Sequence, residues 1–382
     1  MKGARAPLQR DAPGVPCAAI CMLRPALRLS LALLALSPVA GCRRVRARLH
    51  GGPTVRAEVR RGHRLYDRYC ALCHGRDLKG YAADHANALG NRDFLAVASD
   101  GFLRDAITHG RPGTPMSAWS TTAGGPLDAK QIDDLVAFLR SRGRHRPNLL
   151  DESPLTGDLE SARSVWAQRC QSCHGDRGQG SATATSVTHP NFLRVVTPGF
   201  LRRTIRHGRA GTPMQAFVDL SPQTVDGLVA HIHTLSFNPA PPTEPQYEPP
   251  PGLDQSVIHP EGRAPSFTLR EQRFVPADQV MRALNDGRKM IILDARATSD
   301  WHRGHIPGAL PFPFYNIEDM ATRLPRDGTW IIAYCACPHA ASGHVVDELR
   351  RRGFRNTAVL DEGITYWTNH RYPIAHSAQV RP

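Results

Sequence analysis

The sequence predicts a multidomain protein in which two small helical units precede a domain of alternating strands and helices. Two observations indicate the helical units: one stretch of sequence occurs twice within the 382 residues, and segments with apolar residues at helical spacing accompany each copy. A third observation indicates the last domain. Beyond a proline-rich stretch, short apolar runs alternate with helical segments, which is typical of a mostly parallel sheet. The length allows two to four domains, each with its own core.

Composition favours a globular protein and argues against binding to nucleic acid. Hydrophobic residues make up 41% of the chain, and the formal net charge is +14 at pH 7. The basic residues are scattered, and no basic helix is interleaved with aromatic residues, as nucleic-acid binding would favour. The charge instead hints at an acidic partner or a membrane surface.

Residues 1–42 have the features of a bacterial signal peptide with a lipobox. Two arginines precede the apolar run Leu29–Leu36, which is too short to span a bilayer as a mature helix. The run ends in Val39–Cys42, where small residues precede a single cysteine. We expect cleavage before Cys42 and acylation of its sulfur, which would place the protein on the periplasmic side of a bacterial membrane. The alternative is an ordinary cleaved leader without a lipid.

The motif Cys-x-x-Cys-His is the strongest chemical signal in the chain, because it occurs at Cys70–His74 and again at Cys170–His174. This spacing is that of c-type haem attachment. The cysteines form thioethers to the haem vinyl groups, and the histidine is the proximal iron ligand. The sequence therefore predicts two covalently bound haem c groups, attached at Cys70, Cys73, Cys170 and Cys173 and ligated by His74 and His174. Chance occurrence, a zinc site without its second ligand pair and a dithiol redox motif are the weaker alternatives.

A methionine lies about 40 residues after each of these motifs. The stretch Phe102–Met116 is repeated 98 residues later as Phe200–Met214, in a Gly- and Pro-rich context. A thioether is a soft ligand that favours ferrous haem, so Met116 and Met214 are the predicted sixth ligands. His109 and His207 also recur and could supply a second imidazole instead, although a cap at a helix C-terminus explains them adequately. A lone methionine is usually core filler, but the repetition favours a ligand.

Helical segments flank both copies. A predicted helix at Val59–Tyr69, repeated at Leu159–Arg169, leads into each haem motif, and an amphipathic helix closes each unit. The closing helices are Asp128–Arg140 and Ser221–Leu235, with Asp128 and Ser221 as the expected N-caps.

Together, these features resemble class I cytochrome c domains over about residues 55 to 237. The resemblance implies a small all-α bundle around one haem, used twice, in domains 55–146 and 155–237. Class I domains usually have proline after the ligand methionine, whereas Ser117 and Gln215 stand there.

Residues 238–272 are predicted to be a proline-rich linker, because the stretch is thick with proline and lacks apolar periodicity. Buried strands are then predicted at Met290–Arg296 and Gly328–Cys335, and a third at Thr357–Leu360, with a helix from about residue 341 to 352. Several motifs in this region resemble a rhodanese domain over residues 273–380. They are Asp294–Arg296, Trp301–Ala309, Tyr334 with Cys335, Gly353 with Phe354, and Gly363–Trp367.

By this resemblance Cys335 is the nucleophile, at a strand end beneath a helix N-terminus that stabilises a thiolate or persulfide. The family loop usually brings an arginine soon after the cysteine, but no arginine occurs here before Arg350. Three interpretations stay open. Cys335 carries sulfane sulfur while Cys337 resolves it or acts as an alternate nucleophile; Cys335, Cys337 and His339 bind Cu(I); or the domain is a catalytically silent binding module.

These predictions combine into a hypothesis of function. We expect an exported dihaem cytochrome c that exchanges electrons with donor and acceptor proteins, fused to a domain that handles a small inorganic sulfur compound. The alternative is a pure electron carrier to a terminal oxidase or reductase, with the rhodanese-like domain as a docking or Cu(I)-binding module. The nine cysteines divide among leader, lipid, haem and loop, so no disulfide framework is predicted.

Overall fold

A computed structural model describes residues 53–83, 86–112, 114–143, 149–181, 184–235, 246–336 and 339–378. These ranges all belong to one compact unit, Gly51–Pro382. The predicted signal peptide, with its lipobox and Cys42, lies outside the described residues, as does Cys337. Within the described ranges, no helix combines the length and the apolar character needed to cross a bilayer.

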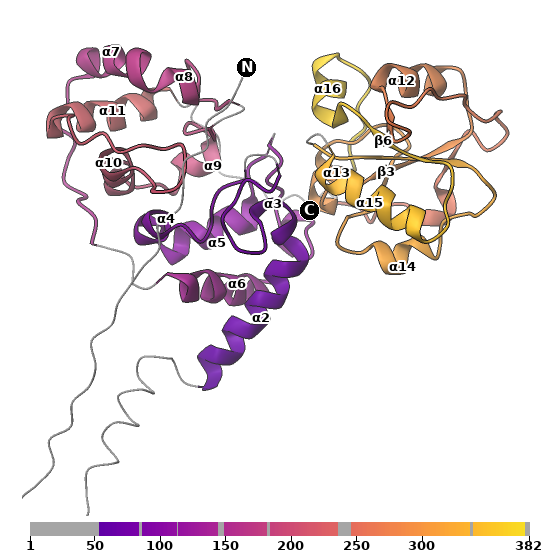
Figure 1. The fold of residues 1–382 in the computed structure, drawn as a ribbon, viewed down its shortest axis with the longest axis horizontal. Coiled ribbons are helices and arrows are strands. Elements are labelled where there is room, and N and C mark those ends of the chain that lie inside the picture. The colour runs from indigo at the N-terminus through magenta and orange to yellow at the C-terminus, as the bar shows by residue number, and fades with distance from the viewer. Residues whose placement is uncertain are drawn as a thin grey trace, which may run out of the picture. The chain divides into compact units, whose positions relative to one another are not determined.

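The first module is built from helices and extends from α2 to α6 (Figure 1). Its long first helix, α2, packs across its last helix, α6. Gly62 permits this crossing, because a Cβ atom at this position would lie 1.9 Å from the backbone oxygen of Asp134. The ring of Tyr66 then packs at a tilt against that of Phe138, with ring centroids 5.3 Å apart. The helices are α2 (Pro53–Tyr69), α3 (Ala71–His74), α4 (Arg92–Val97), α5 (Asp100–His109), the 3₁₀ turn η1 (Thr121–Ala123) and α6 (Ala129–Arg142).

The second module repeats this order from α7 to α11. Trp166 and Ala162 of the first helix replace Tyr66 and Gly62, and the glycine at the crossing is now Gly227 of the last helix. The predicted caps are confirmed: Asp128 accepts a hydrogen bond at the start of α6, and Ser221 does so at the start of α11. The helices are α7 (Leu159–Arg169), α8 (Gln171–His174), α9 (Pro190–Leu193), α10 (Pro198–His207) and α11 (Pro222–Thr234).

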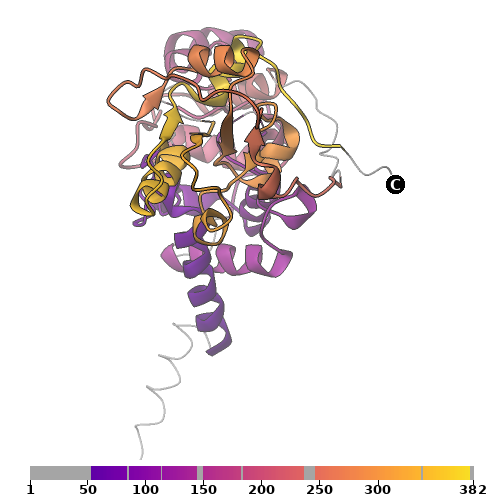
Figure 2. The ribbon, with the colours of Figure 1, turned by 90° about the vertical axis from the view of Figure 1, so that its right-hand side faces the viewer.

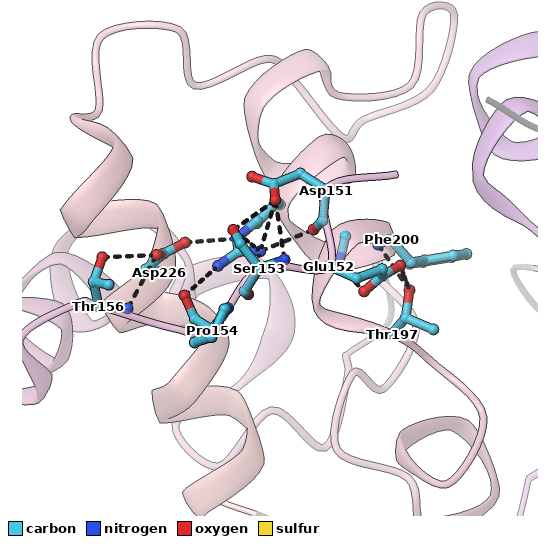
Figure 3. A network of polar contacts seen from close by, with 10 residues as sticks. Asp151, Glu152, Ser153, Pro154, Thr156, Thr197, Phe200 and Asp226 are labelled. Atoms are coloured by element: carbon cyan, nitrogen blue, oxygen red, sulfur yellow. Dashed lines mark hydrogen bonds and ion pairs between the residues drawn. The ribbon is translucent and has the colours of Figure 1, made fainter. Parts of the chain in front are cut away.

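The segment before α7 is bound to the second module by a polar network (Figure 3). Arg202 of α10 donates from Nε to Asp226 of α11 over 2.6 Å and from Nη1 to the backbone oxygen of Asp151 over 2.8 Å. Asp226 also accepts hydrogen bonds from the amide and hydroxyl of Thr156. Glu152 accepts from the hydroxyl of Thr197 at the start of α10. The network therefore holds two helices and the incoming chain together.

The C-terminal domain is built on a six-stranded sheet in the order β1-β3-β5-β6-β2, with β4 paired to β3. All pairings are parallel except that of β1 with β3. The strands are β1 (Val257–Ile258), β2 (Phe274–Val275), β3 (Met290–Asp294), β4 (Leu310–Pro311), β5 (Trp330–Tyr334) and β6 (Thr357–Leu360). β1 falls within the stretch predicted as linker, so part of that stretch contributes to the sheet.

Helices cover both faces of this sheet, as the orange and yellow ribbons in Figures 1 and 2 show. Side chains of α14 and α15 pack with Ile291 and Leu293 on one face, and those of α12 and α16 pack with Met290 and Ile292 on the other. The helices are α12 (Ala277–Asn285), α13 (Thr298–Arg303), α14 (Ile317–Ala321), α15 (Ala340–Arg351) and α16 (Gly363–Asn369), with a 3₁₀ turn η2 (Leu253–Gln255) before β1. The predicted fold class, a duplicated helical region followed by a mostly parallel α/β domain, is confirmed.

Candidate functional site

In both modules the Cys-x-x-Cys-His motif lies where the first helix gives way to a single short turn of helix. The amide of Cys70 donates to the backbone oxygen of Tyr66, and Cys170 makes the same bond to Trp166, each over 2.9 Å. Burial raises the pKa of the Cys70 thiol to about 12 and that of Cys170 to about 11. No disulfide joins the described cysteines. The motif cysteines are therefore held as thiols at helix ends, as covalent attachment of a vinyl group requires.

Each motif histidine is oriented by a hydrogen bond to a backbone carbonyl. Nδ1 of His74 lies 2.8 Å from the oxygen of Asn87, and Nδ1 of His174 lies 3.1 Å from the oxygen of Thr185. A carbonyl can only accept, so Nδ1 carries the proton and Nε2 is left with its lone pair. Burial lowers the pKa of both imidazoles, which keeps them neutral. This is the form in which histidine ligates iron, and the carbonyl is the expected outer-shell partner.

The two methionine loops have the same hydrogen bonds. The Arg111 amide donates to the oxygen of Met116 over 2.7 Å, and the Arg209 amide donates to the oxygen of Met214 over 2.8 Å. A threonine hydroxyl, two residues before each methionine, accepts from the methionine amide over 3.2 Å. Both methionines are partly buried against the hydrophobic core. The two loops thus have equivalent hydrogen bonding, and the donor set of thiols, imidazole and thioether fits haem c.

Glycine is required at the start of each loop. Gly110 and Gly208 have φ angles of 59° and 62°, and a Cβ atom on either would lie within 2.6 Å of the backbone that follows the methionine. The path of the loop therefore explains the glycine of the His-Gly pair that recurs in the sequence.

The arginine after each of these glycines was missed by the sequence reasoning, although it recurs in both copies. Burial lowers the pKa of both Arg111 and Arg209 to about 10. The Arg209 guanidinium lies 5.1 Å from the ring centroid of Phe94 in the other module. Its Nε is buried and has no partner among the described atoms. A buried cation with an unused donor beside a methionine loop suits an anionic group such as a haem propionate.

The modules contact one another through equivalent residues. The Asn91 side chain donates to the oxygen of Ala210 over 2.8 Å, and His189, its counterpart in the repeat, donates from Nε2 to the oxygen of Pro112 over 3.0 Å. Phe102 of α5 stacks on its own counterpart, Phe200 of α10, at 5.1 Å. Each methionine loop is therefore bound by the opposite module.

In the α/β domain, Cys335 follows β5 directly and is buried, with 2% of its surface exposed. Its Sγ lies 3.3 Å from the hydroxyl of Ser342 in the first turn of α15. His339 precedes that helix in the left-handed region, at φ 86°, and its Nε2 lies 2.9 Å from a carboxylate oxygen of Asp361. The thiol is thus at the predicted place, between a strand end and a helix N-terminus.

Two arginines distant in sequence approach this loop. Arg273 donates from Nη2 to the backbone oxygen of Gly343 in α15 over 3.0 Å, and Arg270 is paired with Asp361. Arg273 is itself paired with Asp347. Arg350, the first arginine after Cys335, instead donates to backbone and side-chain oxygens of Gln272 and Thr357. Both arginines near the loop already have carboxylate partners.

No cluster of three or more metal-ligating side chains occurs within the described ranges. Cys337, which the Cu(I) interpretation requires, lies outside them. The buried Asp294 instead anchors the strand end. It accepts from Nη2 of Arg296 over 2.6 Å and from the Tyr334 hydroxyl over 2.7 Å.

Comparison with known proteins agrees with this division. Residues 57–139 and 157–232 match the family described as cytochrome C oxidase, cbb3-type, subunit III, and residues 276–370 match the rhodanese-like domain. The chain has cbb3-type cytochrome c domains and a C-terminal rhodanese-like domain. Both resemblances inferred from the sequence are thereby confirmed.

Several relatives of the cytochrome region are oxidase subunits. Subunit CcoP of the cbb3-type cytochrome c oxidase of Azospirillum sp. (strain B510) is 27% identical over 189 residues, which are 46% of this chain and 61% of that subunit. Subunit FixP of the cbb3-type cytochrome c oxidase of Azorhizobium caulinodans is 28% identical over 174 residues, which are 44% of this chain and 56% of that subunit. These homologues indicate electron transfer in the cytochrome region, and the chain spans about 60% of their length.

The rhodanese-like domain has relatives of its own. The probable adenylyltransferase/sulfurtransferase MoeZ of Mycobacterium tuberculosis is 29% identical over 92 residues, which are 24% of this chain and 23% of that protein.

Proposed function

We propose that the protein is an exported dihaem cytochrome c whose rhodanese-like domain carries sulfane sulfur on Cys335 while a reduced sulfur compound is oxidised. The observation that supports two haems is the identical hydrogen bonding of both modules at the histidine and at the methionine loop. Haem c supplies one-electron transfer at its iron. The attaching residues are Cys70, Cys73, Cys170 and Cys173, and the ligands are His74, Met116, His174 and Met214.

Methionine is favoured over histidine as the sixth ligand. His109 lies with Nε2 3.7 Å from a carboxylate oxygen of Asp105, one turn earlier on α5, so its imidazole is directed along its own helix. Replacing Met116 or Met214 by alanine should abolish the methionine-to-iron charge-transfer band of one haem and keep the other. If the bands persist and His109 or His207 proves essential instead, the assignment is wrong.

The sulfur step can be written on Cys335 with its atoms and electrons balanced. The thiolate and a hydrosulfide ion form the sulfur–sulfur bond of a persulfide, with release of one proton and two electrons. Haems held at Cys70–His74 and Cys170–His174 would supply the oxidant for this step, with a capacity of one electron each. The position of Cys335 before the N-terminus of α15 and beside the Ser342 hydroxyl supports stabilisation of the anionic sulfur. Cys337 is the candidate for resolving the persulfide.

The test is to add sulfide, thiosulfate or polysulfide to the oxidised holoprotein while recording haem absorption. We expect at least one of them to reduce the haems and to leave a persulfide on Cys335 that mass spectrometry detects. The variant Cys335→Ser should keep both haems and lose the reduction. The sulfur role would be refuted if no sulfur compound reduces the haems and no persulfide forms.

A second candidate is an electron carrier for a terminal oxidase or reductase with a silent or Cu(I)-binding rhodanese-like domain. The observations that favour it are the burial of Cys335 and the carboxylate partners that already engage Arg270 and Arg273. If this candidate is correct, sulfur compounds leave the haems oxidised. In its Cu(I)-binding version, the protein binds Cu(I), and Cys335→Ser lowers the affinity for the ion.

We also propose export to the periplasmic side of a bacterial membrane, with a lipid on Cys42, and redox proteins as electron donor and acceptor. The oxidase subunits among the relatives support partners of that class. Labelling with a radioactive fatty acid, with Cys42→Ser as control, tests the anchor.

A further inference from the structure

The rhodanese-like domain contacts the first module at its haem-attachment motif. Leu72, between the two cysteines of Cys70–His74, packs against the hydrophobic cluster that contains Cys335 and Ala341. Helix α3, which carries this motif, also contacts α15, the helix that follows the Cys335 loop. The segment that would anchor the first haem therefore lies against the element that positions the predicted nucleophile.

A second set of contacts holds the methionine loop of the first module. The Ser117 hydroxyl, next to Met116, donates to Oδ2 of Asp300 over 2.5 Å, and the Ser299 hydroxyl donates to the oxygen of Ala118 over 2.6 Å. All four of these contact residues are buried. Buried hydrogen bonds from two adjacent residues of α13 fix the loop in one position relative to the rhodanese-like domain.

Aromatic side chains add to these polar contacts. The ring of Tyr315 meets that of Tyr69 at 4.9 Å and that of Trp119 at 5.8 Å, and Arg68 donates to the backbone oxygen of Tyr315 over 3.2 Å. Burial raises the pKa of Tyr315 to about 12. Buried aromatic rings with polar ends are typical of specific protein interfaces.

The equivalent face of the second module is exposed. Its counterparts of Ala71 and Leu72 are the polar residues Gln171 and Ser172, which are exposed, as is Cys173. After Met214, Gln215 and Ala216 are also exposed, whereas their counterparts in the first module are buried. The residue types agree with this difference in exposure, because Tyr69, which contacts Tyr315, is replaced in the repeat by the charged Arg169.

We propose that the rhodanese-like domain is the built-in redox partner of the first haem, because it covers the face formed by Cys70–His74 and the loop after Met116. A haem held by Cys70, Cys73 and His74 would be the acceptor for electrons released at the Cys335 loop, and the equivalent face of the second module would stay open to an external partner. The electron exchange rests on the proposed function, whereas the covered face does not.

The covered face is tested by hydrogen exchange of the full-length holoprotein, after haem content has confirmed two groups per chain. The variant Leu72→Asp should raise amide exchange at least tenfold at the start of α15 and around Tyr315. The matched variant Ser172→Asp, at the same position of the other motif, should leave these amides unchanged. Equal behaviour of the two variants would overturn the covered face.

A variant on the other side of the contact keeps the test valid should Leu72→Asp impair folding or haem attachment. Tyr315→Ala leaves the haem motif intact and should raise exchange in α3, whereas Tyr366→Ala on α16 should not. Unchanged exchange in α3 of Tyr315→Ala would contradict the proposal.

The electron exchange is tested by stopped-flow mixing of the same proteins with sulfide. Reduction of the haems should slow at least tenfold in Leu72→Asp and in Tyr315→Ala, and proceed normally in Ser172→Asp. Altered hydrogen exchange with an unchanged rate of reduction would reject the electron route through this face. Haems that stay oxidised in the unmodified protein would refute the proposed function, and the hydrogen-exchange result would then decide the covered face by itself.

Discussion

At the residue scale, the repeat places the same ion pair in two different surroundings. Arg104 and Asp133 join α5 to α6. Their counterparts Arg202 and Asp226 join α10 to α11, and Figure 3 shows Asp226 in its network. The side chains of the first pair are about half exposed, at 50% and 56%, whereas those of the second are 11% and 12% exposed. An exposed pair contributes little to stability, but a buried charge that loses its partner is costly.

We therefore expect Asp226→Asn to destabilise the second module by about 3 kcal/mol. The substitution removes the carboxylate 2.6 Å from the buried Arg202 guanidinium and leaves Asp151, 3.6 Å away, as the remaining carboxylate partner. Asp133→Asn is the matched control and should change stability by less than about 1 kcal/mol. Urea unfolding followed by circular dichroism measures both. Similar losses for the two variants would show that burial does not distinguish the pairs.

The stability of the α/β domain should vary with pH through the protonation of His302. Burial lowers its pKa from 6.5 to about 4, while Nδ1 lies 2.9 Å from the hydroxyl of Ser377 and the ring stacks on Tyr247. The folded pKa is below the unfolded one, so this contribution to stability is complete above pH 6.5 and is lost as the pH falls through about 4. We expect a loss on the order of 2 kcal/mol, which His302→Gln should remove from thermal unfolding curves recorded against pH.

At the element scale, the crossing of the first and last helices defines each module. In the first module, the backbone of α6 approaches α2 at Gly62, and Tyr66 packs one turn later. In the second, Gly227 on the last helix faces Ala162 and the backbone of Asp158. The small residue has changed helix between the repeats, but the close approach is retained. The geometry of the crossing, and not a particular position, is what both copies share.

Gly62→Ala should therefore disrupt the first module. The added Cβ would lie 1.9 Å from the oxygen of Asp134, a backbone atom that cannot move without parting the helices. We expect a loss of about 3 kcal/mol or more, because overpacking forces the backbone to shift. Gly101→Ala in α5 is the control: its Cβ would meet only the Ser99 hydroxyl, at 3.7 Å, and helix propensity favours alanine. Differential scanning calorimetry distinguishes the two.

At the scale of the whole molecule, the two modules are coupled through aromatic residues and an ion pair. Phe102 stacks on Phe200 and meets Phe192 edge-on at 6.0 Å, and Arg194 pairs with Asp105 over 2.5 Å. Because these rings are buried between the modules, we expect the two modules to unfold together.

Phe102→Ala should cost about 3–5 kcal/mol, because it removes a buried ring from the contact between modules. Calorimetry should then show two transitions for the cytochrome region in place of one. Phe217→Ala removes a ring of similar burial from the second module alone. It should lower the stability of that module but keep the contact between the modules, so the cytochrome region should still unfold in one transition. A single transition in Phe102→Ala would mean that other contacts suffice to couple the modules.

Much of the fold could be predicted because its signals are local. The haem motifs, the apolar spacing of the helices and the caps Asp128 and Ser221 are patterns within a few residues, and the repeat presents these patterns twice. The strand β1 could not be predicted, since its two residues are stabilised only by pairing with β3. Arg270 and Arg273 were also missed, because their approach to the Cys335 loop depends on the parallel pairing of β2 with β6.

The sequence by itself determined the two haem motifs, the methionine loops, the order of the domains and the position of Cys335 at a strand end. These depend on residue type and spacing, which act over short distances along the chain. Only the tertiary structure decided which face of each module is covered. Leu72 and Ser172 occupy the same place in their motifs, yet Leu72 packs against a cluster that includes Cys335, far along the chain, and Ser172 is exposed. Such long-range burial is a property of the folded surface, and no local pattern specifies it.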